Sequence, residues 1–292
     1  MMKRIFFGAA VLVLLSATGA LAAAAPDVAV EEVQMPAWIE RGGTNIPLVP
    51  GMELKDHDQV KTGPGARVLL STADGSSVKL GERGSLALEN LRMRPDGVFE
   101  AALKVAEGAF RFTTDVLARF RGRREISISI AAVTAGIRGT DLWGKSAPDK
   151  QIVCLIEGKV EVTPPGESPI DLDQRLSFYV RDKGQSQPVA TVMPDQLTQW
   201  ATETETQPGR GVTKRGGKWK VIAASDRSLD KALDASKQLR DAGYAAEIIP
   251  AKVKDKRVYN VVLPNFASRK DAEFVADALK AQGRVERARV GM

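Results

Sequence analysis

The stretch WKVIAASDRSLDKALDASKQLRDAG, residues 219–243, recurs forty residues later as YNVVLPNFASRKDAEFVADALKAQG, residues 259–283. In each copy an aromatic residue opens a short apolar run, a serine precedes a helical pattern, and a glycine follows that pattern. The matched positions are Trp219, Val221, Ser228, Ala232, Leu239 and Gly243 with Tyr259, Val261, Ser268, Ala272, Leu279 and Gly283. This repeat predicts a small domain made of a duplicated β-α-β unit.

The local signals place the elements of each unit. Ser228 and Ser268 stand where the first free amides of a helix need an acceptor, and Gly243 and Gly283 stand where a helix ends in a left-handed residue. We therefore expect strands at 219–223 and 259–263, helices at 228–242 and 268–282, and closing strands at 245–249 and 285–290. Two right-handed units in tandem give a four-stranded antiparallel sheet with both helices on one face, a ferredoxin- or RNP-like α+β fold.

The other face of this sheet is expected to be open. Side chains alternate along a strand, so one set of residues faces the helices and the next set faces outward. The inward set is Val221, Ala223, Val261 and Leu263, and the outward set is Lys220, Ile222, Ala224, Val258, Asn260 and Val262. The outward set predicts the binding surface of the domain.

Residues 38–193 have a different pattern, in which short apolar or alternating runs are separated by tight turns. Val68–Thr72 is followed by Asp74-Gly75 and then by Ser77–Leu80, which is typical of strands joined by hairpins. Residues 126–130 and 152–162 are further predicted strands. We expect an all-β domain, a sandwich or a roll, with at most a short helical turn near residues 116–120.

The ends and connections of these two regions also have recognisable patterns. Lys3 and Arg4 precede a short apolar run from Ile5 to Leu15 and then small residues, which is typical of a cleavable secretory signal peptide. A polar stretch rich in Thr, Glu, Gln and Gly separates the two domains and reads as a linker, whose Gln196–Trp200 could form a helical turn against the β domain. The predicted division is 1–24 signal peptide, 25–37 flexible lead-in, 38–193 β domain, 194–217 linker and 218–292 repeat domain.

Charge is unevenly distributed along the 292 residues. The formal net charge is +6, and residues 218–292 alone hold 16 Lys and Arg against 10 Asp and Glu. The positive charge of the mature protein thus belongs to the repeat domain. It favours an anionic envelope polymer or membrane surface as partner, although ordinary solubility charge on two helices explains it equally well.

Residues for catalysis are scarce. The single histidine, His57, lies in a polar turn, and the single cysteine, Cys154, lies in an apolar run that reads as a buried strand with an inert thiol. The chain has no Gly-x-Ser-x-Gly elbow, phosphate loop or dinucleotide motif, and its acids show no paired spacing. We therefore expect no enzyme activity, no metal and no cofactor.

The segment Gly136-Ile137-Arg138-Gly139-Thr140-Asp141 still indicates an unusual backbone path, because two glycines flank an arginine. One interpretation is a hydrogen-bonded bend that holds Arg138 in an internal ion pair, with Asp141 as a turn acceptor. The other is that Arg138 meets an anionic ligand.

The β region resembles the FecR domain family over about residues 45–163. The motifs that carry the resemblance are Gly51–Leu54, Gln59–Gly63, Ala66–Leu70, Asp74–Ser76, Leu80-Gly81, Gly108–Phe112, Gly136–Asp141 and Glu157–Val162. FecR itself is a membrane-spanning regulator that relays an outer-membrane signal to a sigma factor. This chain lacks the segments that such a relay requires, so the resemblance implies a periplasmic β module that meets a protein partner.

The repeat resembles a SPOR domain over about residues 218–290, with Trp219–Ser225 and Tyr259–Pro264 matching the first and third strands of that family. The resemblance implies binding of peptidoglycan glycan stripped of stem peptides. Ile222 stands where the family often has Gln, and Asn260 where it often has Arg. The expected glycan-binding residues are Lys220, Ile222, Ser225, Lys256, Arg257, Asn260 and Val262.

Two functions remain open at this point. The first is a periplasmic, non-enzymatic protein that binds peptidoglycan through the repeat domain and meets an envelope protein through the β domain, with no nucleic acid partner. The second is an interaction protein whose sheet face packs on protein, because Ile222, Val258 and Val262 make that face apolar. Placement at the septum or throughout the envelope, and oligomeric state, stay open as well.

Overall fold

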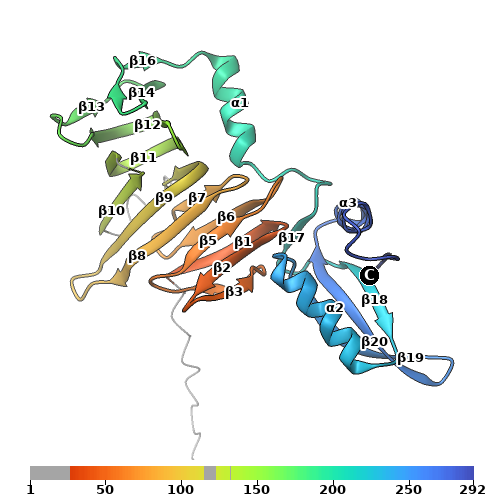
Figure 1. The fold of residues 1–292 in the computed structure, drawn as a ribbon. Coiled ribbons are helices and arrows are strands. Elements are labelled where there is room, and N and C mark those ends of the chain that lie inside the picture. Colours follow the sequence, from red (N-terminus) through yellow and green to blue (C-terminus); the bar gives the residue numbers. More distant parts are fainter. Residues whose placement is uncertain (1–26, 115–122, 132) are drawn as a thin grey trace, which may run out of the picture.

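The computed structural model describes residues 27–114, 123–131 and 133–292, which form an N-terminal β domain and a C-terminal α+β domain (Figure 1). The expected signal peptide at 1–24 and the expected helical turn near residues 116–120 lie outside the described residues. Within the described ranges, the three helices are all too short or too polar for a membrane-crossing segment.

The N-terminal domain is built almost wholly from strands, as the sequence predicts. Gln59–Thr62, Arg67–Thr72 and Ser77–Leu80 fall where alternating runs and turn residues place them. The strands are β1 (Val28–Gln34), β2 (Ala37–Arg41), β3 (Thr44–Pro47), β4 (Glu53–Leu54), β5 (Gln59–Thr62), β6 (Arg67–Thr72), β7 (Ser77–Leu80), β8 (Ser85–Met93), β9 (Val98–Thr113), β10 (Arg123–Ile130), β11 (Val133–Ala147), β12 (Lys150–Thr163), β13 (Ile170–Leu172), β14 (Ser177–Asp182), β15 (Gln185–Ser186) and β16 (Ala190–Thr191).

Long strands that change neighbours hold this domain together. The first half of β9 pairs with β8 and with β10, and its second half pairs with β7 and β11. The change falls at Gly108, which has a φ of +91°, and a Cβ there would lie 2.6 Å from the Cα of Gly84. Only glycine therefore fits at this crossing of two chain segments.

Strand β1 corrects one sequence expectation. Residues 25–37 were predicted as a flexible lead-in, but β1 occupies most of that range and pairs with β4, β6 and β17. Val28, Val30 and Val33 are at most 1% exposed. The stretch Val28-Ala29-Val30 belongs to a buried strand. The sequence did not indicate it, because the apolar run is short and acidic residues flank it.

Helix α1 (Pro194–Thr204) lies against the β domain and covers a second, smaller apolar cluster. The ring of Trp200 stacks on that of Trp143, with centroids 4.6 Å apart and an interplanar angle of 3°. Beyond the helix, Glu205 accepts from Lys79 at 2.6 Å and from Arg111 at 3.2 Å. The helical turn expected at 196–200 is thus a helix of three turns fixed by aromatic stacking and ion pairs.

The C-terminal domain contains the duplicated unit, and both helices begin after the predicted serines. Ser228 and Ser268 each accept from the amide three residues on, and Gly243 and Gly283 have φ values of +85° and +66°. The strand order is β19-β20-β18-β21, all antiparallel. The elements are β18 (Trp219–Asp226), α2 (Leu229–Asp241), β19 (Glu247–Val253), β20 (Lys256–Phe266), α3 (Arg269–Ala281) and β21 (Arg289–Gly291).

The two helices pack on one face of this sheet. Ala232 and Leu239 of α2 and Val275 and Leu279 of α3 are at most 2% exposed. They share one core cluster with Val221, Ala223, Val261 and Leu263, the residues that the alternation assigned to the helix side. This cluster runs on without a break into the core of the β domain.

The segment 194–217, expected to be a polar linker, instead joins the domains firmly through α1 and β17 (Val212–Lys214). Strand β17 pairs with β1 on one side and with β20 on the other, which places the two domains in one hydrogen-bonded assembly. Asp271, 1% exposed at the start of α3, accepts from the amides of Gly209, Gly211 and Val212 at 2.7, 3.1 and 3.0 Å. Its polar composition suggested a linker, because the contacts that order this segment are with residues far away in the sequence.

Replacing Asp271 with alanine should destabilise this junction, because three buried amides would lose their acceptor. We expect the free energy of unfolding to fall by roughly 2–4 kcal/mol, measured by urea denaturation, and proteolytic cleavage near residues 207–212 to speed up. Asp277→Ala, which removes only an exposed pair with Lys280 on the same helix, should change stability by less than about 0.5 kcal/mol. Equal effects of the two substitutions would contradict this role of Asp271.

Cys154 lies under helix α1 in the Trp143–Trp200 cluster and is fully buried. Burial raises the pKa of its thiol to about 12, so the thiolate fraction at pH 8 is on the order of one in ten thousand. A disulfide reagent such as dithionitrobenzoate should leave the native protein unmodified and titrate one thiol in guanidinium chloride. Rapid modification of the native protein would show that α1 opens readily.

Candidate functional site

The sheet of the C-terminal domain has one face without helices, and the register of its strands defines which residues share it. Ile222 of β18 lies opposite Val262 of β20, and Val262 lies opposite Glu247 of β19. Ile222 also lies opposite Arg289 of β21. Opposed residues point to the same side of a sheet, so these four side chains form one row across the open face.

A bulge in β18 changes the alternation that the sequence predicts. The register shifts between Ile222 and Ala224, so that Ala224 lies opposite Val261 and packs against the core on the helix side. The expectation that Ala224 faces outward is therefore wrong. The same bulge brings Ser225 opposite Asn260 on the open face, where Ser225 is exposed.

Two valines expected on the exposed surface are buried. Val258 is 8% exposed and Val262 is 2% exposed, yet neither belongs to the core cluster beneath the helices. Both lie on the central strand β20, which is flanked by β18 and β19. The accessible apolar group of this face is Ile249 on β19, which is 41% exposed and lies opposite Asn260.

Asn260 is the central polar residue of the open face. It lies between Ser225 and Ile249 across three strands. Its side-chain Oδ1 atom is buried and has no hydrogen-bond partner among the described residues. A buried amide oxygen of this kind is an acceptor that suits the N–H of an acetamido group or a sugar hydroxyl.

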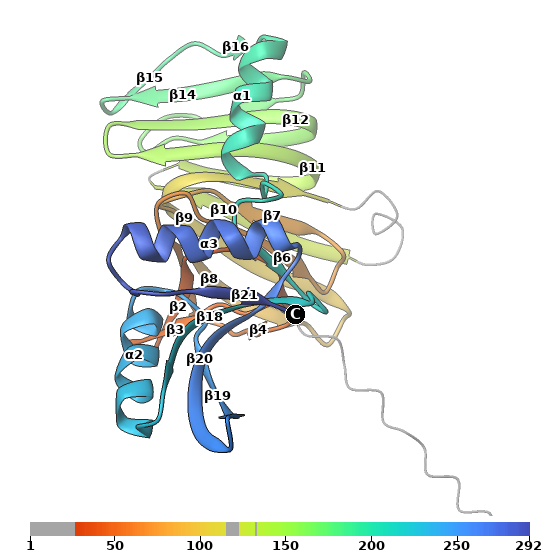
Figure 2. The same cartoon turned by 90° about the vertical axis from the view of Figure 1, so that its right-hand side faces the viewer.

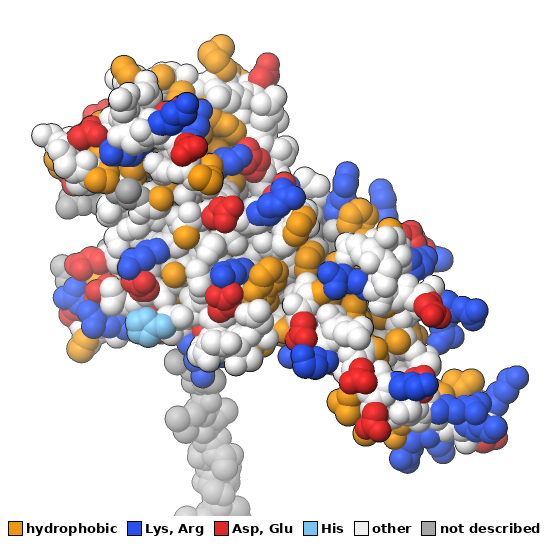
Figure 3. All heavy atoms as spheres, in the orientation of Figure 1, with side chains coloured by type: hydrophobic (Ala, Val, Ile, Leu, Met, Phe, Trp, Pro, Cys, Tyr) orange, Lys and Arg blue, Asp and Glu red, His pale blue; other side chains and the backbone are white. Residues whose placement is uncertain are grey.

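Basic side chains surround this face. Lys220 is half-buried beside Ile222, and Lys256 and Arg257 are exposed where β20 begins. Figure 3 shows Lys and Arg side chains gathered on the C-terminal domain, including the end from which the β19–β20 hairpin projects. Glu247 and Arg289 complete the row, and sequence reasoning missed both because it stopped at the two central strands.

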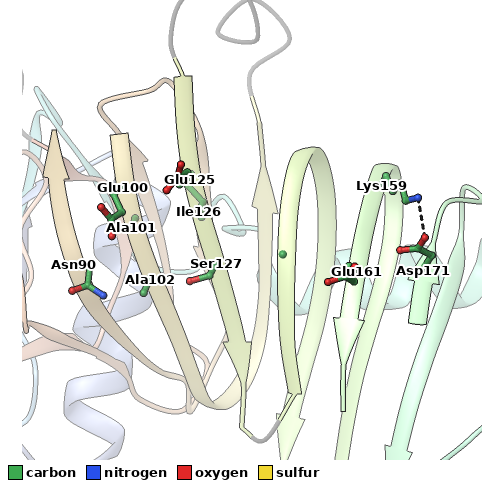
Figure 4. Close-up of a pocket in the computed structure, with 11 residues that line it drawn as sticks. Asn90, Glu100, Ala101, Ala102, Glu125, Ile126, Ser127, Lys159, Glu161 and Asp171 are labelled. Carbon is green, nitrogen blue, oxygen red and sulfur yellow. Dashed lines mark hydrogen bonds and ion pairs between the residues drawn. The ribbon is translucent and has the colours of Figure 1, made fainter. Parts of the chain in front are cut away.

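The β domain carries a trough with a volume of about 640 Å³ on its outer surface. Figure 4 shows Glu100 and Glu125 on one side of it, with Ala102 and Ser127 further along the same two strands, and Glu161 and Asp171 on the other side. Lys159 Nζ donates to Asp171 at 2.9 Å. The trough is therefore acidic, and Gly136 lines it as well.

The Gly136–Asp141 segment is part of strand β11, with register shifts on both sides of residue 141. Asp141 accepts two hydrogen bonds from Arg111, at 2.9 and 2.7 Å, and the bond to Asp141 raises the pKa of the Arg111 guanidinium. Asp141 is thus an ion-pair acceptor in the sheet, consistent with a structural role for the bend. The side chain of Arg138 lies outside the described residues.

The remaining candidate groups are isolated. His57 is exposed in a turn beside Asp56, at 3.4 Å, as expected for a solvated residue. In the described ranges, no three His, Cys, Asp or Glu side chains come together in a way that could hold a metal ion. Cys154 is buried under α1, as the sequence indicates.

The fold and its surfaces define a two-domain binding protein, with a β domain docked on a small α+β module that keeps one sheet face open. The sequence model described as FecR protein matches residues 58–161, and that of the SPOR domain matches residues 215–286. The chain therefore contains a FecR domain followed by a SPOR domain. A SPOR domain implies peptidoglycan binding and association with the cell envelope, and a FecR domain suggests protein interaction; both are binding or regulatory domains.

Solved structures with a similar course of the chain were also found. A crystal structure at 1.65 Å of a "putative anti-sigma factor" from Parabacteroides distasonis is 17% identical, with 77% of this chain and 91% of that chain covered and a TM-score of 0.40. A second crystal structure described in the same words, at 2.50 Å, is 16% identical, with 77% and 90% covered and a TM-score of 0.40. No curated protein sequence matches this chain.

Replacing Asn260 with valine should stabilise the protein while removing a binding group. The substitution deletes a buried oxygen without a partner and places a β-branched residue in a central strand, so we expect a gain of about 1 kcal/mol in the free energy of unfolding. Denaturant titration measures it. Asn45→Val on the exposed strand β3 is the matched control, with a change below about 0.5 kcal/mol. A loss of stability in Asn260→Val alone would show that Oδ1 has a partner in solution.

Proposed function

We propose that this protein is a periplasmic, non-enzymatic envelope protein that binds peptidoglycan glycan through the open sheet face of its SPOR domain and presents its FecR domain to a protein partner. The observation that supports it most is the match to the SPOR domain together with a sheet face that no other part of the described chain covers. The apolar run at residues 5–15 supports export, and the positive charge of residues 218–292 suits a carboxylate-bearing polymer.

The polar groups of the face fit a glycan chain. Asn260 offers an amide acceptor, Ser225 offers a hydroxyl beside it, and Lys220 stands two residues before Ile222 on the same side of β18. Lys256, exposed at the start of β20 and on the same side of the sheet as Asn260, is placed to meet a lactyl carboxylate of an extended strand, whereas Arg257 alternates to the other side. Ile249, which is 41% exposed and lies opposite Asn260, is the apolar side chain of this face on which a sugar ring can lie.

Docking of the two domains gives the FecR domain a fixed position relative to the bound polymer. Strand β17 pairs with both β1 and β20, so the β domain cannot swing freely on a tether. Strands β10 and β12, which carry much of the acidic trough, lie on the side of the β domain away from the SPOR domain (Figure 1), where the trough is available to a protein partner. Attachment to the wall would thus orient this surface.

The apolar side chains of the same face support a second function, the binding of protein. Ile249 is 41% exposed and Val253 is 53% exposed, both on edge strand β19. An exposed edge strand with such residues can pair with another protein chain. In that case the SPOR sheet would be a protein interface, with a partner or with a second copy of this chain.

Retention on purified peptidoglycan sacculi tests the proposal. The protein should sediment with sacculi, and the Lys220→Ala, Asn260→Ala double variant should bind about tenfold more weakly because it loses one charge-assisted and one neutral hydrogen bond. Lys237→Ala, which removes an exposed charge on α2, should bind like wild type, and added salt should weaken all three.

The two functions give different results in this experiment. Absence of wild-type retention on sacculi contradicts glycan binding. If the mass of the protein then rises with concentration, and Ile249→Lys or Val253→Lys prevents the rise, the sheet face is a protein interface.

A further inference from the structure

A cavity of about 790 Å³ lies between the FecR domain and the helix layer of the SPOR domain. Trp38 of β2 and Arg67 of β6 line it from the FecR side, and Tyr244 and Phe274 line it from the SPOR side. Because α2 and α3 cover the opposite face of the sheet from Asn260, this interdomain cleft is separate from the open face. Its walls are held together by β17 and by a direct hydrogen bond from the amide of Ala37 to the carbonyl of Gly243 at 3.1 Å.

Two residues that line this cleft, Arg67 and Trp38, each have a buried hydrogen-bond donor without an acceptor among the described residues. Arg67 is only 9% exposed, and its two terminal nitrogens donate to the carbonyls of Gly65 at 3.2 Å and Thr202 at 3.1 Å. Its Nε atom has no partner among the described residues, and neither has the indole Nε1 of Trp38. Burying a guanidinium without a carboxylate is costly, which indicates that the cleft is built to receive an anion.

The charges around the cleft also favour binding of an anion. Arg67, Arg210 and Arg284 line it against one carboxylate, Glu82, in the described chain. Glu82 already accepts from the amide of Gly65 at 2.6 Å. Burial lowers the pKa of Arg67, and the neighbouring positive charge of Arg210 lowers it further against the opposing effects of Glu82 and Glu203. A bound anion would relieve this repulsion.

The aromatic residues of the cleft supply a surface for a ring. Phe274 is 41% exposed, and the guanidinium carbon of Arg210 lies 5.7 Å from its ring centroid. Trp38 is partly exposed on the facing wall, and Gly243 must be glycine there because a Cβ would lie 2.8 Å from the Trp38 ring. A flat group entering the cleft therefore meets an aromatic ring from each domain.

We propose that this interdomain cleft is a second binding site of the protein, for a small organic anion in which a carboxylate stands near a ring with an apolar face, either an aromatic ring or the C–H face of a sugar. The carboxylate would accept from Arg67 Nε and Trp38 Nε1, with Arg210 and Arg284 closing over it, while the ring lies against Trp38 and Phe274. Such a group occurs on acidic amino sugars and on peptide termini that end in an aromatic residue. The site bridges both domains, so its ligand favours the docked arrangement.

The indole N–H resonances of the protein give a direct readout, because the chain has four tryptophans and Trp38→Phe assigns the signal. The protein is titrated with N-acetylmuramic acid against N-acetylglucosamine, and with N-acetylphenylalanine against its amide. We expect one acid to shift the Trp38 signal saturably and to bind about tenfold more tightly than its neutral counterpart. The pair that responds distinguishes a sugar acid from a peptide terminus. No saturable shift with either acid, or equal binding of the neutral compound, overturns the proposal.

Substitutions locate the binding and separate it from the function proposed above. Arg210→Ala with Arg284→Ala, both exposed residues, should weaken the responding acid about tenfold, whereas Lys231→Ala on the exposed side of α2 should not. Arg67→Lys keeps the charge and removes the Nε donor, and its fold is checked by thermal denaturation. The Lys220→Ala, Asn260→Ala variant should keep the Trp38 response in full, so failure of sacculus binding and failure of this site are distinguishable. Unchanged affinity in the double arginine variant contradicts the site.

Discussion

The relative position of the two domains depends on one short strand, β17, and on the carboxylate of Asp271, which fixes the segment that leads into this strand. Residues 212–214 pair with β1 of the FecR domain and with β20 of the SPOR domain, and Asp271 accepts from three amides of the preceding turn. Because strand pairing is directional and Asp271 is buried, the domains meet in one orientation. The continuous apolar core across the junction follows from this constraint.

Docking divides the SPOR domain into two surfaces with different chemistry. Its helix layer faces the FecR domain and encloses the interdomain cleft, in which donors without acceptors collect around Arg67. Its open sheet face lies on the other side of the sheet. There the unpaired group is an acceptor, the side-chain oxygen of Asn260. An isolated SPOR domain would have only the second of these surfaces, since Trp38 and Arg67 belong to the other domain.

Local signals predicted well wherever a short segment decides its own structure. Ser228, Ser268, Gly243 and Gly283 mark the helix ends because capping depends on neighbours in sequence. The bulge in β18 was not predictable from alternation, since it depends on how β18 fits against β20. It turns the side chain of Ala224 to the helix side and brings Ser225 to the open face. Burial of Val258 and Val262 likewise depends on the strands that flank β20.

By itself the sequence determined the two domains, their order and the open sheet, because periodicity, caps and turn residues act over a few positions. Alternation also assigned Lys220 and Asn260 to the open face, whereas Ser225 reaches that face through the bulge in β18. The tertiary structure alone decided that residues 28–34 form a strand, that residues 194–217 fasten the domains together, and that an arginine-lined cleft exists between them. These features arise from pairing between segments up to 180 residues apart, such as Thr213 with Val33, and no local pattern encodes such a contact.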